Sequence, residues 1–135
     1  LLLLLFIAIT TFKSTVKGQK PVYQIDIKKE IDNTTRLYLR NGLEEAKSLG
    51  ADAILLHMNT YGGLLEAADS MRTAILYYPV PVYVFIVNNA ASAGALISIA
   101  CKKIFMRKGA NIGAATVVNQ TGAALPDNIN HTCVR

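Results

Sequence analysis

Ser92 lies in a stretch that could present a nucleophile. An apolar, β-branched run over residues 80–87 leads into Asn88-Asn89-Ala90-Ala91-Ser92-Ala93-Gly94-Ala95-Leu96, and a small-residue run continues to Ala100. The first run is typical of a buried strand and the second of a helix, so Ser92 is expected at a strand-to-helix junction. The first N–H groups of a helix lack internal partners, so a hydroxyl there could attack a carbonyl while these groups hold the oxyanion. The alternative is a helix N-cap serine in an Ala-rich core helix.

A second small-residue turn, Asn59-Thr60-Tyr61-Gly62-Gly63, follows another apolar run. Glycines let backbone N–H groups approach a ligand closely, and those of Gly63 and Ala93 could converge on one oxygen, as acyl transfer requires. A tight strand–helix turn is the alternative role for the two glycines. Common phosphate-binding loops have the pattern Gly-x-x-x-x-Gly-Lys-Ser/Thr or Gly-x-Gly-x-x-Gly. The turn has neither pattern, which argues against a phosphate-binding site.

A serine nucleophile needs a base, and the sequence offers no obvious one. The two histidines are His57, inside an apolar run and therefore expected in the core or the wall of a cleft, and His131 near the end of the sequence. Burial can lower the pKa of a lysine enough for it to act as base. Lys102, Lys103 and Lys108, however, are typical of surface charges.

The elements that must position these residues alternate between strands and helices. Apolar runs of strand length are predicted at 22–27, 53–58, 80–87 and 103–106. Helical spacing of apolar residues predicts helices between them, and the segment 111–115 is expected to be a loop near the site. The expected apolar helix faces are Leu39, Leu43 and Ala46, with Gly50 as the stop, and Leu64, Ala68, Met71 and Ile75, with Pro79 closing the helix; the third helix is expected over 90–100.

This alternation predicts an α/β fold with a mostly parallel sheet and right-handed crossovers. In such sheets ligands bind beyond the carboxyl ends of the strands. The turn at 59–63 and the Ser92 segment both follow a strand and open a helix. Both are therefore expected at that edge of the sheet.

Composition excludes several classes of function. The 135 residues are 52% hydrophobic and 17% charged, which indicates one globular domain. The net charge of +5 comes from scattered basic residues without an aromatic-interleaved patch, which argues against nucleic-acid binding. The two cysteines, Cys101 and Cys133, form neither a disulfide framework nor a metal motif, and Cys101 is expected to be a small core residue. We expect no cofactor and no metal.

The first residues, Leu1-Leu2-Leu3-Leu4-Leu5-Phe6-Ile7-Ala8-Ile9, resemble the apolar region of a secretory signal. The run is shorter than the roughly 20 residues that a membrane-spanning helix needs. We expect residues 1–18 to be a partial signal peptide, with an uncleaved signal anchor as the alternative. Both place the folded part outside the cytoplasm.

Three ordered motifs carry a resemblance to a known family. They are Ala53 to Gly63, Pro81 to Gly94, and Gly109-Ala110-Asn111-Ile112-Gly113-Ala114-Ala115. Together they resemble the membrane-bound ClpP-class serine proteases, and more closely the long-form NfeD proteins, relatives of signal peptide peptidase A. The resemblance implies a ClpP/crotonase-like fold over 19–127, incomplete at the C-terminus.

The resemblance also implies roles for individual residues. Ser92 would be the nucleophile, and Gly63 and Ala93 would form the oxyanion hole. Tyr61, Gly62 and Gly94 would contact substrate. The implied substrates are hydrophobic segments of membrane proteins, such as a stomatin-like partner, and the intact protein is expected to be a membrane-associated homo-oligomer.

Two departures from the family pattern stand out. The family usually has Asp-Thr-Pro-Gly-Gly where this chain has Asn59 and Tyr61, a change that leaves the glycines intact. The family's Ser-Lys dyad also implies a lysine at the position of Asn128. Deleting one A from codons for a family-like continuation, Asp-Lys-Tyr-Gln-Ser-Tyr-Met, produces the tail read here. We therefore expect residues 128–135 to be an aberrant, frameshifted tail.

The sequence thus predicts part of a serine endopeptidase whose base is missing. Without that lysine, Ser92 would keep an ordinary hydroxyl and this chain would be inactive. A non-catalytic pseudoprotease that binds apolar peptides or scaffolds membrane partners is one alternative. A crotonase-type acyl-CoA enzyme is the other, although the apolar leader argues against a cytoplasmic enzyme.

Overall fold

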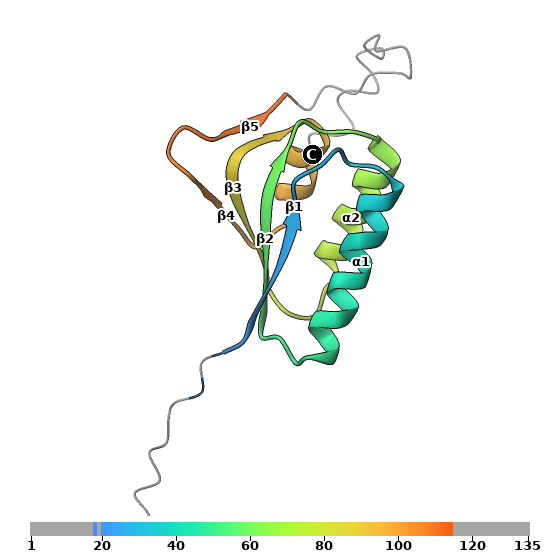
Figure 1. Cartoon of the computed structure of the whole chain (residues 1–135), viewed down its shortest axis with the longest axis vertical. Coiled ribbons are helices and arrows are strands. Elements are labelled where there is room, and N and C mark those ends of the chain that lie inside the picture. Colours follow the sequence, from blue (N-terminus) through green and yellow to red (C-terminus); the bar gives the residue numbers. More distant parts are fainter. Residues whose placement is uncertain (1–17, 19, 115–135) are drawn as a thin grey trace, which may run out of the picture.

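The computed structural model describes Gly18 and residues 20–114, in which strands and helices alternate along the chain (Figure 1). Of the predicted leader 1–18 only Gly18 is described, and the predicted tail 128–135 lies outside the described residues. The elements are β1 (Val22–Ile27), α1 (Asn33–Ser48), β2 (Ala53–Thr60), α2 (Leu65–Leu76), β3 (Val82–Ala91), α3 (Ala93–Ser98), β4 (Lys103–Met106) and β5 (Asn111–Gly113).

All paired strands of the sheet run parallel, which confirms the predicted α/β class. The order is β1-β2-β3-β4, and β5 pairs with β3 beyond the end of β4. The first half of β3 therefore has β4 as its neighbour and the second half has β5. The carboxyl ends of β2 and β3 meet at one edge of the sheet, as the sequence predicts.

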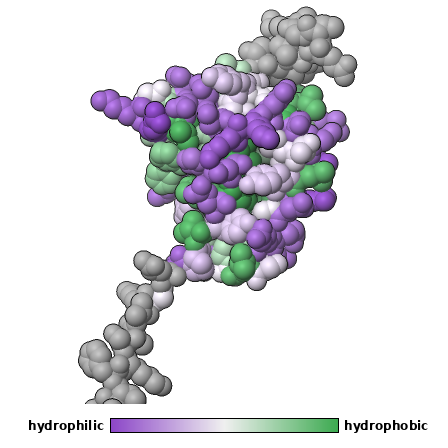
Figure 2. Space-filling model, viewed as in Figure 1, coloured by the Kyte–Doolittle hydropathy of each residue, from purple (hydrophilic) through white to green (hydrophobic). Residues whose placement is uncertain are grey.

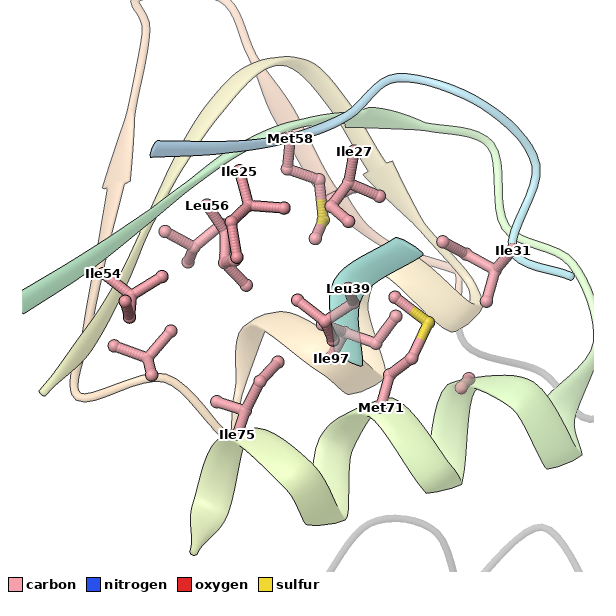
Figure 3. Close-up of a cluster of buried hydrophobic side chains, with 14 of the residues drawn as sticks. Ile25, Ile27, Ile31, Leu39, Ile54, Leu56, Met58, Met71, Ile75 and Ile97 are labelled. Carbon is pink, nitrogen blue, oxygen red and sulfur yellow. The ribbon is translucent and has the colours of Figure 1, made fainter. Parts of the chain in front are cut away.

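The hydrophobic core lies between the sheet and the helices, which pack on one face of it (Figure 1). Alternate side chains of β1, β2 and β3 point toward apolar residues of the helices, and Figure 3 shows this interdigitation. Removing these large side chains from water supplies the main driving force for the fold. The face drawn in Figure 2 is mostly hydrophilic, with hydrophobic residues in small groups. The largest fully buried apolar side chains are Ile25, Ile27, Ile31, Leu39, Ile54, Leu56, Met58, Met71, Ile86, Ile97 and Val84.

The first helix follows its sequence pattern closely. Asp32 is the N-cap, and its carboxylate accepts a hydrogen bond from the Thr35 N–H at 2.7 Å. This bond to the charged form holds the pKa of Asp32 below its ordinary value. Gly50, just beyond the C-cap Leu49, has φ 66°, a conformation that glycine adopts without strain. The predicted inner face of Leu39, Leu43 and Ala46 is buried.

The second helix differs from its prediction at both ends. Leu64 was predicted on the buried face, but it is the N-cap and is 54% exposed. Its N–H donates to the carbonyl of Ile31, so it belongs to the preceding extended segment rather than to the helix. Ala67, Ala68, Met71 and Ile75 form the buried face, and the helix ends at Leu76, before Pro79.

The third strand–helix unit corrects the sequence prediction most clearly. The predicted helix over 90–100 is wrong at its start, because β3 continues to Ala91 and α3 covers only Ala93–Ser98. The segment 111–115, predicted as a loop, contains β5, whose pairing with the end of β3 keeps that end extended. Cys101 packs against the core, and burial raises the pKa of its thiol to about 12, which agrees with the predicted core role. Among the described residues, no helix has the length and apolarity to cross a membrane.

Candidate active site

Ser92 occupies the junction between β3 and α3, as predicted, in an unusual backbone conformation. Its φ is 50° and its ψ is −114°, a left-handed φ that residues with a side chain rarely adopt. Ser92 is the N-cap residue of α3, yet its side chain makes no capping hydrogen bond. The alternative of an N-cap serine thus holds for the position of Ser92, but its hydroxyl does not cap the helix. A serine on a strained strand-to-helix turn is the arrangement that exposes a nucleophilic hydroxyl in many hydrolases.

The turn after β2 lies directly against Ser92. A Cβ on Gly62 would sit 2.8 Å from the Ser92 Cβ and 3.3 Å from its Oγ. Gly62 has φ 116°, which also favours glycine. The two loops that the sequence predicts at one sheet edge are thus in contact, and only a residue without a side chain allows that contact.

Gly63 is held by a short parallel bridge to Ile31. The Ile31 N–H donates to the Gly62 carbonyl at 2.8 Å, and the Leu64 N–H donates to the Ile31 carbonyl at 2.7 Å. Backbone groups of successive residues in an extended segment alternate between its two edges. The N–H of Gly63 therefore belongs to the edge opposite Ile31, where the bridge does not use it.

Ala93 is the first residue of α3, so its N–H has no partner within the helix. The N–H groups of Ala95 and Leu96 both donate to the Ser92 carbonyl, at 3.0 and 3.2 Å. Gly94 is buried, and its Cα lies against Thr60. Free N–H groups on the residues that follow a nucleophile can stabilise an oxyanion.

Strand β5 fixes the backbone of Ser92 from the other side. The Ser92 N–H donates to the Gly113 carbonyl at 2.8 Å. The N–H of Ser92 is therefore occupied and cannot itself act as an oxyanion donor. Ser92 thus lies between two extended segments, the Gly62–Gly63 turn and β5.

A cavity of about 420 Å³ adjoins the glycine turn on the side of the β1–α1 connection. Tyr61, at the rim of the glycine turn, is 81% exposed. Neither Ser92 nor Ala93 lines this cavity, so it offers room for a ligand group beside the glycine turn rather than at the candidate nucleophile. Its lining residues are Lys28, Lys29, Glu30, Asn59, Thr60, Tyr61, Gly62 and Gly63.

His57 is engaged elsewhere. Its Nδ1 lies 3.1 Å from the Asp26 carboxylate, and its ring stacks parallel to Phe85 with centroids 6.0 Å apart. The pKa of Asp26 is lowered chiefly by the hydrogen bond from Lys28. This cluster lies on the sheet face opposite the helices, because His57 alternates with the core residues of β2. His131 and Asn128 lie outside the described residues.

Two further residues, Asn59 and Thr60, hold the site together, and neither is among the predicted site residues. The pairing of β2 with β3 shifts register between Met58 and Thr60, and the Asn59 side chain accepts a hydrogen bond from the Asn89 N–H there, at 3.2 Å. The hydroxyl of Thr60, which is buried, bonds the backbone of Gly62. A threonine two residues before a glycine is a spacing at which hydroxyls bond the backbone, and this signal was available in the sequence.

Comparison with known proteins shows which family the chain belongs to. The model of the family "NfeD1b, N-terminal domain" matches residues 21–133. The chain belongs to this family. Membrane protein NfeD1b of Bacillus subtilis is 35% identical over 106 residues, which are 78% of this chain and 24% of that protein. Membrane-bound protease PH1510 of Pyrococcus horikoshii is 28% identical over 116 residues, 84% of this chain and 26% of that protein.

Solved structures give the same result for the NfeD1b-type domain. The 1510-N membrane-bound stomatin-specific protease, as a K138A mutant in complex with a substrate peptide, has a TM-score of 0.78 and 27% identity over 85% of this chain and 56% of that one. ClpP1 from Listeria monocytogenes has a TM-score of 0.69 over 82% of this chain and 65% of that one, and at 22% identity shows the fold alone. The fold is therefore ClpP-like, and the chain is homologous to a protease of this class. It spans about a quarter of the length of the two curated relatives.

Proposed function

We propose that this domain is the serine-bearing part of a membrane-associated endopeptidase of the ClpP class. The observation that carries the proposal is the uncapped Ser92 side chain, held at φ 50° against Gly62. A structural serine at the start of a helix would cap it and avoid the left-handed region. A strained, uncapped serine beside a glycine turn instead fits a nucleophile that must reach a carbonyl.

The proposed reaction is acyl transfer. The Ser92 Oγ attacks the carbonyl carbon of a peptide bond, its proton passes to a base, and the carbonyl oxygen becomes an oxyanion. The N–H groups of Gly63 and Ala93 then donate to that oxyanion. Collapse of the tetrahedral intermediate breaks the C–N bond, and the amine leaves with the proton. Water later hydrolyses the ester to Ser92.

Two features support Gly63 and Ala93 as the donors. The bridge to Ile31 uses the neighbouring backbone groups and leaves the Gly63 N–H for the opposite edge. Ala93 follows the nucleophile directly at the start of α3. Losing one such donor typically slows a reaction about 10²–10³-fold, so the pair would account for much of the catalysis.

The proposed substrate is an apolar segment of a membrane protein, in an extended conformation. The solved relative acts on a stomatin and has been captured with a substrate peptide, which favours a stomatin-like substrate here. We propose that Tyr61 and the backbone of Gly62 contact the peptide. Gly94 has only backbone groups to offer to the peptide, and Thr60 covers its Cα. An exported, membrane-associated, oligomeric protein is part of the same proposal.

The base is proposed to be a lysine at position 128, where this chain has asparagine. The oxyanion hole and substrate binding alone do not activate the serine. The full chain, with asparagine at this position, should therefore react little or not at all with a fluorophosphonate. The frame-restored chain, in which one inserted base at codon 128 returns the reading frame and the lysine, should react much faster.

The test is fluorophosphonate labelling followed by peptide mapping, with Ser92→Ala as the control. Labelling at Ser92 in the native frame-restored chain, and its loss after denaturation, would support the protease. If neither chain is labelled while both bind an apolar peptide, the domain is a scaffold. If inserting one base near codon 128 of the gene does not restore an open reading frame past codon 127, the proposed lysine is wrong.

A further inference from the structure

We infer that Thr60 is a positioning residue that sets the spacing between the glycine turn and the serine helix. The inference rests on the proposed function, since it concerns the two loops that would hold the oxyanion. Thr60 is the last residue of β2 and is only 2% exposed. Its two branches contact different loops. The hydroxyl bonds the glycine turn, and the methyl packs on the helix that begins after Ser92.

The hydroxyl branch holds Gly62. The Gly62 N–H donates to the Thr60 Oγ at 3.2 Å, and the same hydroxyl lies 3.4 Å from the Gly62 carbonyl, to which it can donate. Gly62 is buried, so its N–H would lack a partner without this oxygen. The adjoining peptide leads to the N–H of Gly63. The hydroxyl therefore orients that proposed donor together with the Ile31 N–H, which donates to the same Gly62 carbonyl at 2.8 Å.

The methyl branch holds the start of α3. A Cβ on Gly94 would lie 2.6 Å from the Thr60 Cγ2, which means that the methyl sits directly on the Gly94 backbone. Gly94 follows Ala93, the second proposed donor. One buried side chain thus touches both loops that supply oxyanion donors, and its two functional groups act on different ones.

The two branches can be separated by substitution. Thr60→Val keeps the shape and the methyl contact with Gly94 but removes the hydroxyl, whereas Thr60→Ser keeps the hydroxyl and removes the methyl. Thr73→Val makes the same chemical change at an exposed site of α2 and serves as the control. The full chain and the frame-restored chain both carry each substitution.

The first measurement is the rate of fluorophosphonate labelling at Ser92, resolved into binding and reaction steps. We expect T60V to slow the reaction step about 10- to 100-fold with little change in binding, because a small displacement of a donor is costly. T60S keeps the hydroxyl and loses only the methyl contact with Gly94, so it should slow the reaction less than T60V, and T73V should match the parent. An unlabelled frame-restored parent would contradict the proposed function, whereas equal labelling of frame-restored T60V and its parent would overturn only the role of Thr60.

The second measurement needs no reactivity. Native-state hydrogen exchange of the Gly62 amide reports its hydrogen bond directly. We expect this exchange to be at least about tenfold faster in T60V and close to the parent in T60S. Unchanged Gly62 exchange in T60V would overturn the inference even if no variant reacts with the probe. Equal acceleration in T60S and T60V would also overturn it, because the hydroxyl would then have no role of its own.

Discussion

Replacing Gly94 by alanine should destabilise the protein through a single contact. The new Cβ would lie 2.6 Å from the Thr60 Cγ2, while the Ala90 Cβ and the Met58 Sδ, each 3.6 Å away, are at ordinary contact distances. Thr60 cannot rotate away without breaking its hydrogen bonds to the glycine turn. Overpacking costs about 1–3 kcal/mol, and we expect the upper part of that range, about 2–3 kcal/mol, because the approach is close and the methyl is held in place. The higher helix propensity of alanine offsets up to about 1 kcal/mol, which leaves a net loss of about 1–2 kcal/mol.

Urea unfolding measures this loss, and the midpoint should fall by about 0.5–1 M. Gly42→Ala in α1 is the matched control, because its Cβ would meet only the side chain of Ile25, closest at its terminal Cδ1 (2.9 Å) and then at Cγ1 (3.2 Å), where a small rotation relieves the contact. That variant should be as stable as the parent or more so. Adding Thr60→Ser to Gly94→Ala removes the clashing methyl and should recover stability relative to the sum of the single changes. If G94A is as stable as G42A, or the double variant shows no recovery, the close packing of these loops is wrong.

Substitutions at three other positions test the same framework. Gly63→Ala places a Cβ 2.1 Å from the Ile31 carbonyl oxygen, so it should break the bridge and slow fluorophosphonate labelling of the frame-restored chain at least about 10²-fold, which native labelling kinetics would check. Asn59→Asp keeps the side-chain oxygen that accepts a hydrogen bond from the Asn89 N–H, so this variant should be labelled at the rate of the parent. Asn59→Leu removes that oxygen and should be labelled more slowly. Equal labelling rates of the two variants would contradict the role of this hydrogen bond. The lowered pKa of Asp32 means that its stabilisation is present above the ordinary value of 3.8 and lost as the pH falls through the folded-state pKa. Urea midpoints of the parent should therefore decline on acidification more steeply than those of Asp32→Asn, which keeps an acceptor for Thr35 without titrating.

The sequence predicted those elements whose local signals agree with their environment. β1 and β4 have the predicted bounds, and α1 buries its predicted face and ends just before Gly50. The end of β3 was not predictable in this way. Residues 88–91 are asparagines and alanines with little strand propensity, and they are extended because β5 pairs with them. β5 itself is only three residues long, too short for any periodic pattern.

The candidate site was predictable as far as single residues carry their own signal. A serine between an apolar strand and an Ala-rich run indicates a strand–helix junction, and paired glycines indicate a close approach of backbone. The contact between Ser92 and Gly62, and the left-handed φ of Ser92, depend on how the strands are arranged. Thr60 carried a local signal, but its contact with Gly94 exists only in the folded chain.

The first half of β3 pairs with β4 and the second half with β5, and the second pairing has a consequence for synthesis of the protein. Ser92 leaves the ribosome well before Gly113, whose carbonyl is the acceptor for the Ser92 amide. Until then the backbone around the serine lacks the bond that holds it in its strained form. The proposed nucleophile is therefore completed late on the growing chain, after β1 to β3 and the earlier helices can already pack. Under the proposed function, this order limits the time in which an incomplete enzyme could attack its own unfolded segments.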